Sequence, residues 1–286
     1  MKNPKSNFAF FGTPALAVEI LEALEKAGHT PAVIVTMPDR AQGRGMEMRE
    51  TAVAAWGGDR GIPVLKPEAL DADFISHFTS FNAQFAIVVA YGKILPQALL
   101  DVHPMYNIHY SLLPRWRGAT PVESAILAGD TETGVALQRI VHKLDAGPVV
   151  ALEETTIGKN ETAPALRTRL NGIAAELLVR VFPALSEGAS EERVQDESAI
   201  THCGKIAKED GHVSLSDSAE TLDRKFRAYY GWPGIYTFFE RGGKQIRTII
   251  AEAHLKGGTF VITKVKPEGK GVISYEDFLR SGVKPL

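Results

Sequence analysis

The stretch "FAFFGTPALAVEILEALEKAG", residues 8–28, decides the fold class of the first part of the chain. It begins with an apolar run that is typical of a buried strand and that ends at Gly12. A helical pattern follows, in which Thr13 is expected to cap the helix, Pro14 to lie in its first turn and Gly28 to end it. A strand, a tight turn and a helix in this order form the unit from which parallel α/β sheets are built.

Five more short apolar runs alternate with helical patterns further along the chain. They are "PAVIVT" (31–36), "FAIVVA" (85–90), "YNIHYS" (106–111), "GVALQRIV" (134–141) and "GPVVALEE" (147–154). This alternation predicts an α/β domain with a doubly wound, mostly parallel sheet. Ligands of such sheets bind at the carboxyl ends of the strands, so functional side chains are expected there.

The last part of the chain has a different pattern. Its strand candidates are "GIYTFFE" (234–240), "QIRTIIAEAHL" (245–255), "TFVITKVKPE" (259–268) and "GVISYEDFL" (271–279). Glycine turns separate these runs, which predicts a small β-barrel or meander. Residues 185–205, between the two parts, are polar, acidic and rich in serine, as is typical of a surface connection. We therefore predict one domain over residues 1–190, a linker over 191–207 and a second domain over 208–286.

The composition is that of an ordinary globular protein, with 286 residues, 44% hydrophobic content and a net charge of -2. This charge gives no global attraction to nucleic acid or membrane, so a site for a polyanion must be local. Residues 205–286 carry 14 Lys and Arg against 10 Asp and Glu, which is an excess of four positive charges. The single cysteine, Cys203, excludes an internal disulfide, and the apolar start is too short for a signal peptide or membrane span. A cytoplasmic protein without a membrane partner is expected.

The first glycine turn does not have the dinucleotide fingerprint. That fingerprint needs three glycines after the strand and an acidic residue at the end of the second strand. Only Gly12 is present here, and Asp39 by itself is more typical of a turn. Nicotinamide chemistry is therefore disfavoured.

A candidate reaction site lies in "NIHYSLLP", residues 107–114. Alternate side chains of a strand share a face, so Asn107 and His109 should project together, away from Ile108. An amide can donate to a developing oxyanion, and an imidazole can move a proton near neutral pH. Asp145, in the turn "LDAG", could orient that imidazole and hold a water. The same residue types also fit a strand end and an ordinary turn, so both interpretations stay open.

Histidines elsewhere give no metal site. His103 and His142 have no ligand spacing with carboxylates or cysteine, so no catalytic metal is predicted.

Taken together, several motifs resemble the folate-dependent formyltransferases. In chain order these are "FFGTPALA", "MPDRAQGRG", "VVAYGKILP", "NIHYSLLPRWRGATPVESAILAGDTETGVALQRI" and "LDAGPVV". In the second part, "QDESAITHCGKIAKEDG", "FRAYYGWPGIYT" and "VKPEGKGVISYEDFLRSG" are similar to the C-terminal domain of the members that act on methionyl-tRNA. The resemblance spans essentially the whole chain. It implies a Rossmann-like catalytic domain and a C-terminal tRNA-binding β-barrel similar to an OB-fold.

The activity that this resemblance implies is transfer of a formyl group from 10-formyltetrahydrofolate to the α-amine of methionyl initiator tRNA, for translation initiation. The catalytic set of the family falls on Asn107, His109 and Asp145. Its folate contacts fall on the following residues of this chain: Ser111, Leu112, Leu113 and Pro114, with Tyr91, Gly92 and Ile94 lining the same pocket.

The tRNA contacts implied by the resemblance lie in two regions. The loop after the second strand contributes Arg40, Arg44 and Arg49, although Met46, Glu47 and Met48 stand where the family is rich in lysine. The candidates in the second domain are Arg224, Lys225, Arg227, Lys244, Arg247, Lys264 and Lys266. Charged residues of this number also fit an ordinary solvated surface.

Trp232 is expected to serve the structure, whereas the effect of Tyr110 on the pocket stays open. Trp232 should pack in a corner with Pro233 and Gly234, and Tyr110 should point away from Asn107 and His109. Three other functions stay open: a formyltransferase acting on a nucleotide-linked amino sugar, a folate-dependent hydrolase, and a non-catalytic tRNA-binding protein. No stable protein partner is implied.

Overall fold

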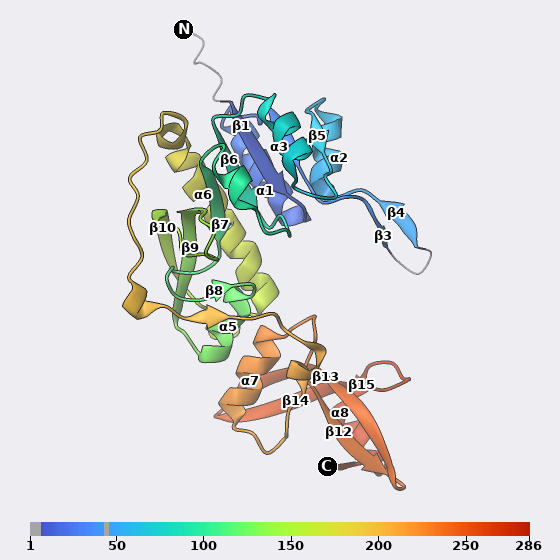
Figure 1. Ribbon diagram of the computed structural model, residues 1–286. Helices are drawn as coiled ribbons and strands as arrows, with labels where there is room; N and C mark the ends of the chain where they lie inside the picture. Colours follow the sequence, from blue (N-terminus) through green and yellow to red (C-terminus); the bar gives the residue numbers. More distant parts are fainter. Residues whose placement is uncertain (1–6, 43–45) are drawn as a thin grey trace. The chain divides into compact units, whose positions relative to one another are not determined.

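The computed structural model describes residues 7–42 and 46–286, which group into two compact units (Figure 1). The first, here called the sheet unit, contains the residues up to Arg117 together with Gly134–Glu154 and Thr168–His202. The second, here called the C-terminal unit, contains Gly118–Thr133, Thr155–Arg167 and Cys203–Leu286.

The chain enters the C-terminal unit for the last time between His202 and Cys203, inside the linker predicted at 191–207. Two earlier segments, 118–133 and 155–167, also belong to that unit. A linear division of the sequence could not show these segments, because their composition resembles that of their neighbours. The domain limits of 1–190 and 208–286 stay a prediction.

A seven-stranded sheet in the order β10-β9-β7-β6-β1-β2-β5 forms the centre of the sheet unit. Its strands are β1 (Phe8–Gly12), β2 (Val33–Val35), β5 (Val64–Leu65), β6 (Phe85–Val89), β7 (Met105–His109), β9 (Glu132–Arg139) and β10 (Val149–Thr156). The pairs β1–β2, β1–β6, β2–β5 and β6–β7 are parallel, whereas β7 and β9 are antiparallel. The mostly parallel sheet is confirmed, and each of the five further apolar runs overlaps one of its strands, whereas β5 was not predicted.

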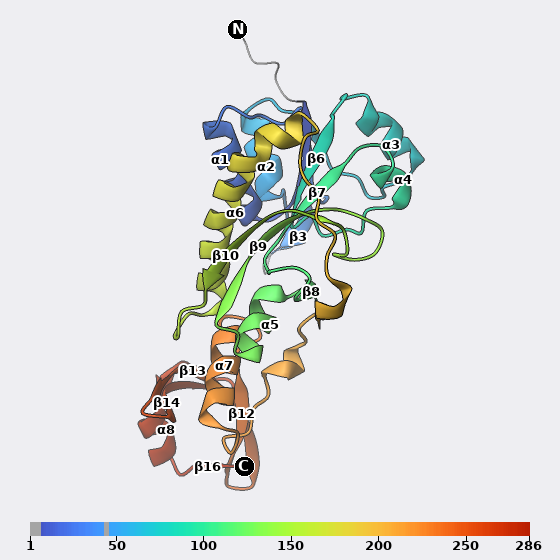
Figure 2. The same cartoon turned by 90° about the vertical axis from the view of Figure 1, so that its left-hand side faces the viewer.

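Helices cover both faces of this sheet, which explains why its strands read as continuous apolar runs. The helices are α1 (Ala15–Lys26), α2 (Ala52–Asp59), α3 (Ala72–Thr79), α4 (Gln97–Leu100) and α6 (Ala163–Ser186). Figure 2 shows α1, α2 and α6 on one side of β6 and β7, and α3 and α4 on the other. On β1, Phe11 packs edge-on against Phe78 of α3, and Phe8 packs edge-on against Phe182 of α6. All four rings are buried.

Helix α1 begins differently from the prediction. Pro14 lies at its N-cap position and no side chain caps the helix, so the expected cap by Thr13 is wrong. The Thr13 hydroxyl instead donates to the carbonyl oxygen of Tyr91 at 2.7 Å, so it is already engaged outside the helix. The expected end at Gly28 is confirmed, because this residue follows the helix with φ +87°, a conformation that glycine adopts without strain.

The C-terminal unit contains a five-stranded antiparallel sheet in the order β15-β14-β13-β12-β16, which fits the small barrel-like domain predicted. Its strands are β12 (Tyr236–Arg241), β13 (Lys244–Lys256), β14 (Thr259–Pro267), β15 (Ile273–Ser274) and β16 (Lys284–Pro285). The helices of the unit are α5 (Pro121–Ala128), α7 (Ala219–Ala228) and α8 (Tyr275–Arg280). Phe239, Val265, Phe278 and Val283 form the buried core of this sheet.

The expected strand "GVISYEDFL" is wrong beyond Ser274, where helix α8 begins. The Ser274 hydroxyl accepts a hydrogen bond from the Asp277 N–H at 3.0 Å and caps the helix. Glu276 and Asp277 lie in the first turn, where acidic side chains stabilise the positive end of the helix dipole. Serine followed by acidic residues is a helix-start signal in the sequence.

The remaining elements are short. β3 (Arg40–Gln42) and β4 (Glu47–Arg49) form a hairpin that extends away from the sheet (Figure 1), and β8 (Arg117–Gly118) pairs with β11 (His202–Cys203). Single 3₁₀ turns span Glu197–Ala199 and Lys208–Gly211. Within the part of the chain that the structure describes, no helix combines the length and apolar character needed to cross a membrane.

Candidate active site

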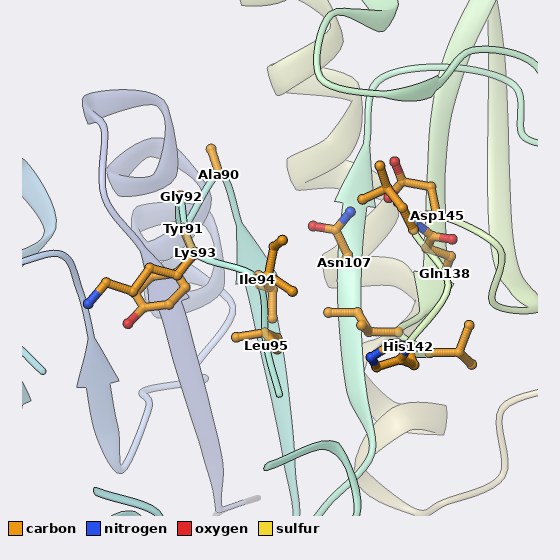
Figure 3. Close-up of a pocket in the computed structure, with 14 residues that line it drawn as sticks. Ala90, Tyr91, Gly92, Lys93, Ile94, Leu95, Asn107, Gln138, His142 and Asp145 are labelled. Carbon is orange, nitrogen blue, oxygen red and sulfur yellow. The ribbon is translucent and has the colours of Figure 1, made fainter. Parts of the chain in front are cut away.

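A pocket of about 300 Å³ lies in the sheet unit, beside the carboxyl end of β6. Figure 3 shows the loop from Ala90 to Leu95 on one side of it and Gln138, His142 and Asp145 on the other, with Asn107 between them. The rest of the lining consists of Val88, Ile140, Val141 and Leu144. The pocket therefore occupies the position at which open α/β sheets bind their ligands.

The loop after β6 is held in a fixed shape by hydrogen bonds. The Thr13 hydroxyl donates to the Tyr91 carbonyl oxygen, and the Lys93 ammonium donates to the carbonyl oxygens of Pro67 and Glu68, each at 2.6 Å. Gly92 has φ +98°, a conformation that residues with a side chain rarely adopt. Glycine is thus required at the point where the loop turns toward the pocket.

The mouth of the pocket is unusually apolar. Ile94 is 88% exposed, Leu144 66% and Val141 38%, although all three side chains line the pocket. Large apolar side chains that gather around a concavity are typical of ligand sites, because a bound ring removes them from water. Beneath them, burial raises the pKa of Tyr91 to about 12, so its hydroxyl stays protonated at neutral pH.

Asn107 lies on β7, directly opposite Gln138 of the antiparallel strand β9. Its side chain lines the pocket, and no other described residue forms a hydrogen bond with its amide. An amide that the fold leaves available can donate to an oxygen of a bound molecule.

His109 lies two residues further along β7 and is 5% exposed. Its Nε2 is 2.9 Å from the carbonyl oxygen of Trp116. A carbonyl oxygen only accepts, so in this contact the proton of a neutral imidazole is on Nε2 and Nδ1 is the acceptor. Nδ1 is 3.8 Å from Oδ2 of Asp145, which is too long for a direct hydrogen bond but is a distance that one water molecule can bridge.

Two glutamines hold Asp145. Its Oδ1 accepts a hydrogen bond from Nε2 of Gln138 at 2.8 Å, and its backbone carbonyl oxygen accepts one from Nε2 of Gln195 at 2.8 Å. Asp145 has φ +49°, and a Cβ on the nearby Gly147 would lie 1.7 Å from the Arg139 carbonyl oxygen. The turn is therefore packed against β9 in a conformation that needs external support.

The buried Arg117 continues this network. Its guanidinium donates to Oε1 of Gln195 from Nε at 3.0 Å and from Nη2 at 2.8 Å, and Nη2 also lies 3.1 Å from the exposed Glu197. Hydrogen bonds from Arg117 and Lys143 lower the pKa of the Glu197 carboxyl. Gln138, Gln195 and Arg117 were not among the functional residues predicted from the sequence. The alternation of "GVALQRIV" against "YNIHYS" could have indicated Gln138, since it shares a face with Asn107.

The structure brings together five of the predicted catalytic and folate-binding residues in one pocket: Asn107, Asp145, Tyr91, Gly92 and Ile94. His109 is outside the lining but faces Asp145.

The predicted folate residues 111–114 do not line this pocket. The Ser111 hydroxyl donates to the Arg115 carbonyl oxygen at 2.5 Å, and Leu113 is buried. Leu113 and Pro114 line a separate hollow beside β10, and the Leu112 side chain packs close to Gly134. These residues stay a prediction as folate contacts.

Tyr110 points away from the pocket, as expected. Its hydroxyl donates to Oδ1 of Asn171 on α6 at 2.8 Å, and Asn171 in turn donates to Glu19 and to the Leu16 carbonyl oxygen on α1. The side chain of Tyr110 therefore ties the end of β7 to two helices.

Two of the three arginines predicted to contact tRNA near the pocket lie on the β3–β4 hairpin. Arg40 and Arg49 face each other across the hairpin and are both exposed. Arg49 is 3.6 Å from Glu47, an exposed contact of little strength. Arg44 lies outside the described residues.

Several of the cations predicted in the C-terminal unit already have partners there. Arg224 donates to the Ala128 carbonyl oxygen at the end of α5, Lys225 to that of His212, and Arg227 pairs with Asp223 at 2.7 Å. Arg247 stacks on the Tyr236 ring at 3.7 Å, and Lys264 pairs with Glu252 at 2.8 Å. Lys244 and Lys266 are exposed. Their roles toward tRNA stay predictions.

The expected packing of Trp232 is wrong. Its side chain is 60% exposed and the neighbouring Tyr230 is 48% exposed, so the ring does not fill a corner of the core. Ile235 and Tyr236, which follow in the sequence, supply buried side chains instead.

Acidic and histidine side chains do not gather into a metal site. Across residues 7–42 and 46–286 there is no group of three or more His, Cys, Asp or Glu side chains that could hold an ion.

The sequence matches the formyl transferase family over residues 6–182 and the C-terminal domain of formyl transferases over residues 205–256. The chain belongs to the formyl transferase family. The methionyl-tRNA formyltransferase of Methylococcus capsulatus is 37% identical over 297 residues, which cover 95% of this chain and 96% of that relative. The methionyl-tRNA formyltransferase of Thermus thermophilus is 39% identical over 267 residues, which cover 92% and 86% of the two chains. This formyl transferase is thus an enzyme that moves a one-carbon formyl group.

A solved structure supports the fold of this formyl transferase. HypX from Aquifex aeolicus in complex with tetrahydrofolic acid has a TM-score of 0.65 at 16% identity and covers 96% of this chain and 46% of that chain. At this identity the likeness shows the shared fold alone, a Rossmann-like sheet followed by a smaller domain.

Proposed function

We propose that the chain transfers the formyl group of 10-formyltetrahydrofolate to the α-amine of methionyl initiator tRNA. The observation that carries this proposal is that similarity to methionyl-tRNA formyltransferases extends through nearly the whole chain, at 37% and 39% identity. The product would be N-formylmethionyl-tRNA for translation initiation. Because the acceptor is a tRNA, we also propose a cytoplasmic location.

The pocket in the sheet unit suits the folate donor. A pterin is a flat heterocycle, and the exposed apolar side chains of Ile94, Val141 and Leu144 can cover its faces. Tyr91 and Gly92 complete the same wall. The donor would supply the formyl carbon, and attack by a neutral amine would place negative charge on the formyl oxygen and positive charge on the nitrogen. Collapse of this adduct would break the bond between the formyl carbon and the folate nitrogen, and tetrahydrofolate would leave with the proton that the amine gives up.

Asn107 would stabilise the negative charge. Its amide lines the pocket without a partner among the described residues, so it can donate to the oxygen without first breaking a bond inside the protein. A fixed strand position reduces the reorganisation needed when that charge develops.

His109 would accept the proton that the amine loses, and Asp145 would stabilise the resulting charge. The Nε2–H of His109 is directed at the Trp116 carbonyl oxygen, so Nδ1 is the nitrogen available to accept. Asp145 faces Nδ1 at 3.8 Å and would stabilise the imidazolium that forms, directly or through a water.

Exposed cations would bind the tRNA. Arg40 and Arg49 on the hairpin can contact phosphates, and Arg44 is proposed with them from the family resemblance. We propose residues 208–286 as a tRNA-binding domain, in which Lys244 and Lys266 are exposed on the surface.

The direct test is formyl transfer by the purified protein from 10-formyltetrahydrofolate to methionyl initiator tRNA. Uncharged tRNA and a nucleotide-linked amino sugar serve as parallel acceptors, and free formate is measured in each reaction. Product on the charged tRNA alone would support the proposal. Product on the sugar amine, or formate without transfer, would assign the pocket to the alternative acceptors.

A further inference from the structure

Gln195 lies outside the pocket but contacts the turn that carries Asp145. It is 6% exposed and follows α6 in the sequence, 50 residues after Asp145. Hydrogen-bond donors lie on one side of its side-chain amide and acceptors on the other, so the amide has one defined orientation.

The amide oxygen of Gln195 faces Arg117. Both Nε and Nη2 of that guanidinium donate to Oε1, at 3.0 and 2.8 Å, and a guanidinium has only donors. Nε2 of Gln195 faces the backbone carbonyl oxygens of Asp145 and Gly147 at 2.8 and 2.6 Å, which only accept. A flipped amide would set donor against donor and oxygen against oxygen, so a single orientation is satisfied.

The side-chain amide of Gln138 also has a single satisfied orientation. Its Oε1 lies 3.5 Å from Nε2 of Gln195, and its Nε2 donates to Oδ1 of Asp145 at 2.8 Å. The two glutamines therefore hold Asp145 at its backbone and at its carboxylate. The second carboxylate oxygen of Asp145, Oδ2, faces Nδ1 of His109 at 3.8 Å.

Asp145 needs this support because its backbone is in the left-handed region, with φ +49°. Such a conformation persists in a residue with a side chain only where its surroundings impose it. We propose that Gln195, locked in orientation by Arg117, is a positioning residue that holds Asp145 in register with His109 for formyl transfer. This inference rests on the proposed function.

The decisive variant is Gln195→Glu. Glutamate keeps the volume and offers Arg117 a stronger acceptor, but its ionised carboxylate cannot donate to the carbonyl oxygens of Asp145 and Gly147. We expect kcat to fall about ten- to a hundred-fold, as when a ligating or reacting group loses its supporting contact. The KM for methionyl-tRNA should change less than about twofold, since Gln195 does not line the pocket. Gln84→Glu, which adds the same charge at an exposed glutamine of the sheet unit, should behave as wild type.

A double-mutant cycle separates positioning from a purely structural role. If Gln195 acts through Asp145, adding Gln195→Glu to Asp145→Asn should lower the residual rate by less than about twofold. Independent losses in the two variants would overturn the proposal, as would wild-type kcat in a folded Gln195→Glu.

Hydrogen–deuterium exchange tests the same contact without activity. The segment 140–149 should exchange faster in Gln195→Glu than in wild type or in Gln84→Glu, because two of its carbonyl contacts are lost. Unchanged exchange would overturn the positioning role. A wild-type enzyme that transfers no formyl group would instead contradict the proposed function and leave this readout to decide the role of Gln195.

Discussion

The pocket and the β3–β4 hairpin hold their polar side chains in opposite ways. In the pocket, His109 and Asp145 are nearly buried and their orientations are set by Trp116, Gln138 and Gln195. On the hairpin, Arg40 and Arg49 are exposed, and the guanidinium of Arg49 forms a weak pair with Glu47. Buried groups are arranged before a substrate arrives, whereas exposed cations act through charge and adapt to a polyanion. Substitutions should therefore change turnover in the first region and salt-dependent binding in the second.

The largest effect is expected from Asn107→Ala. Loss of a donor to a developing oxyanion typically lowers turnover by about 10² to 10³. Single-turnover formyl transfer with saturating substrates measures this step, and thermal unfolding checks that the variant is folded. Asn160→Ala, at an exposed asparagine, is the matched control. Normal turnover in folded Asn107→Ala would remove this amide from the mechanism. It would also contradict the expectation that substitutions in the pocket, unlike those on the hairpin, lower turnover.

A smaller effect, on binding, is expected from Leu144→Ala. Removing an apolar side chain that a folate ring would cover should raise the KM for the donor about tenfold, while kcat changes little. Steady-state kinetics with varied 10-formyltetrahydrofolate measures both constants. Leu279→Ala removes another exposed leucine, from the C-terminal unit, and should leave both constants unchanged. Equal effects of the two variants would show that the apolar mouth does not bind the donor.

Arg40→Ala should have an effect of only a few-fold, and only at low salt. Each phosphate contact contributes about one unit to the slope of log affinity against log salt concentration. The slope for the variant should therefore be less steep by about one unit. Competition binding of methionyl-tRNA between low and physiological salt measures it, with Lys26→Ala on α1 as a control. A salt-independent loss would mean that Arg40 supports the structure, as the pocket residues do.

The smallest effect is expected from Tyr91→Phe at neutral pH. The Tyr91 hydroxyl is buried and no described residue offers it a hydrogen bond, so its removal should leave the free energy of unfolding unchanged or slightly higher. In wild type, burial raises the pKa of Tyr91 to about 12, above the ordinary value of 10.0. The stabilisation by the neutral phenol is therefore complete below about pH 10 and is lost as the pH rises toward 12. Denaturant unfolding should show a smaller loss over this interval in Tyr91→Phe than in wild type; equal losses would contradict the assigned cause.

The sequence predicted the sheet because burial on both faces leaves continuous apolar runs, as in β1, β2 and β6. Asn107, His109 and Asp145 could be selected because their types suit the chemistry and their motifs resemble those of the family. The support around them was not predictable. Gln195 reaches Arg117 and Gln138 across 78 and 57 residues, a pairing that follows no helical or strand period.

Predictions from neighbouring residues were wrong where the folded chain gives a side chain a distant partner or leaves it exposed. Thr13 was predicted to cap a helix because it precedes a proline, but the Tyr91 carbonyl oxygen takes its hydroxyl. Trp232 was predicted to pack in a corner with Pro233 and Gly234, but its side chain is 60% exposed, and Ile235 and Tyr236 are the buried side chains of this segment. The capping signal of Ser274 was present in the sequence and was outweighed by the apolar character of "GVISYEDFL".

The place of Gln195 in the chain bears on how this enzyme can be shortened or split. The family match to residue 182 and the predicted limit at 190 both end before it, although each includes Asn107, His109 and Asp145. A fragment cut at either point would keep the reacting groups and lose the segment that fixes one of them. If Gln195 has the proposed positioning role, a truncated enzyme has to retain this residue to keep Asp145 in place.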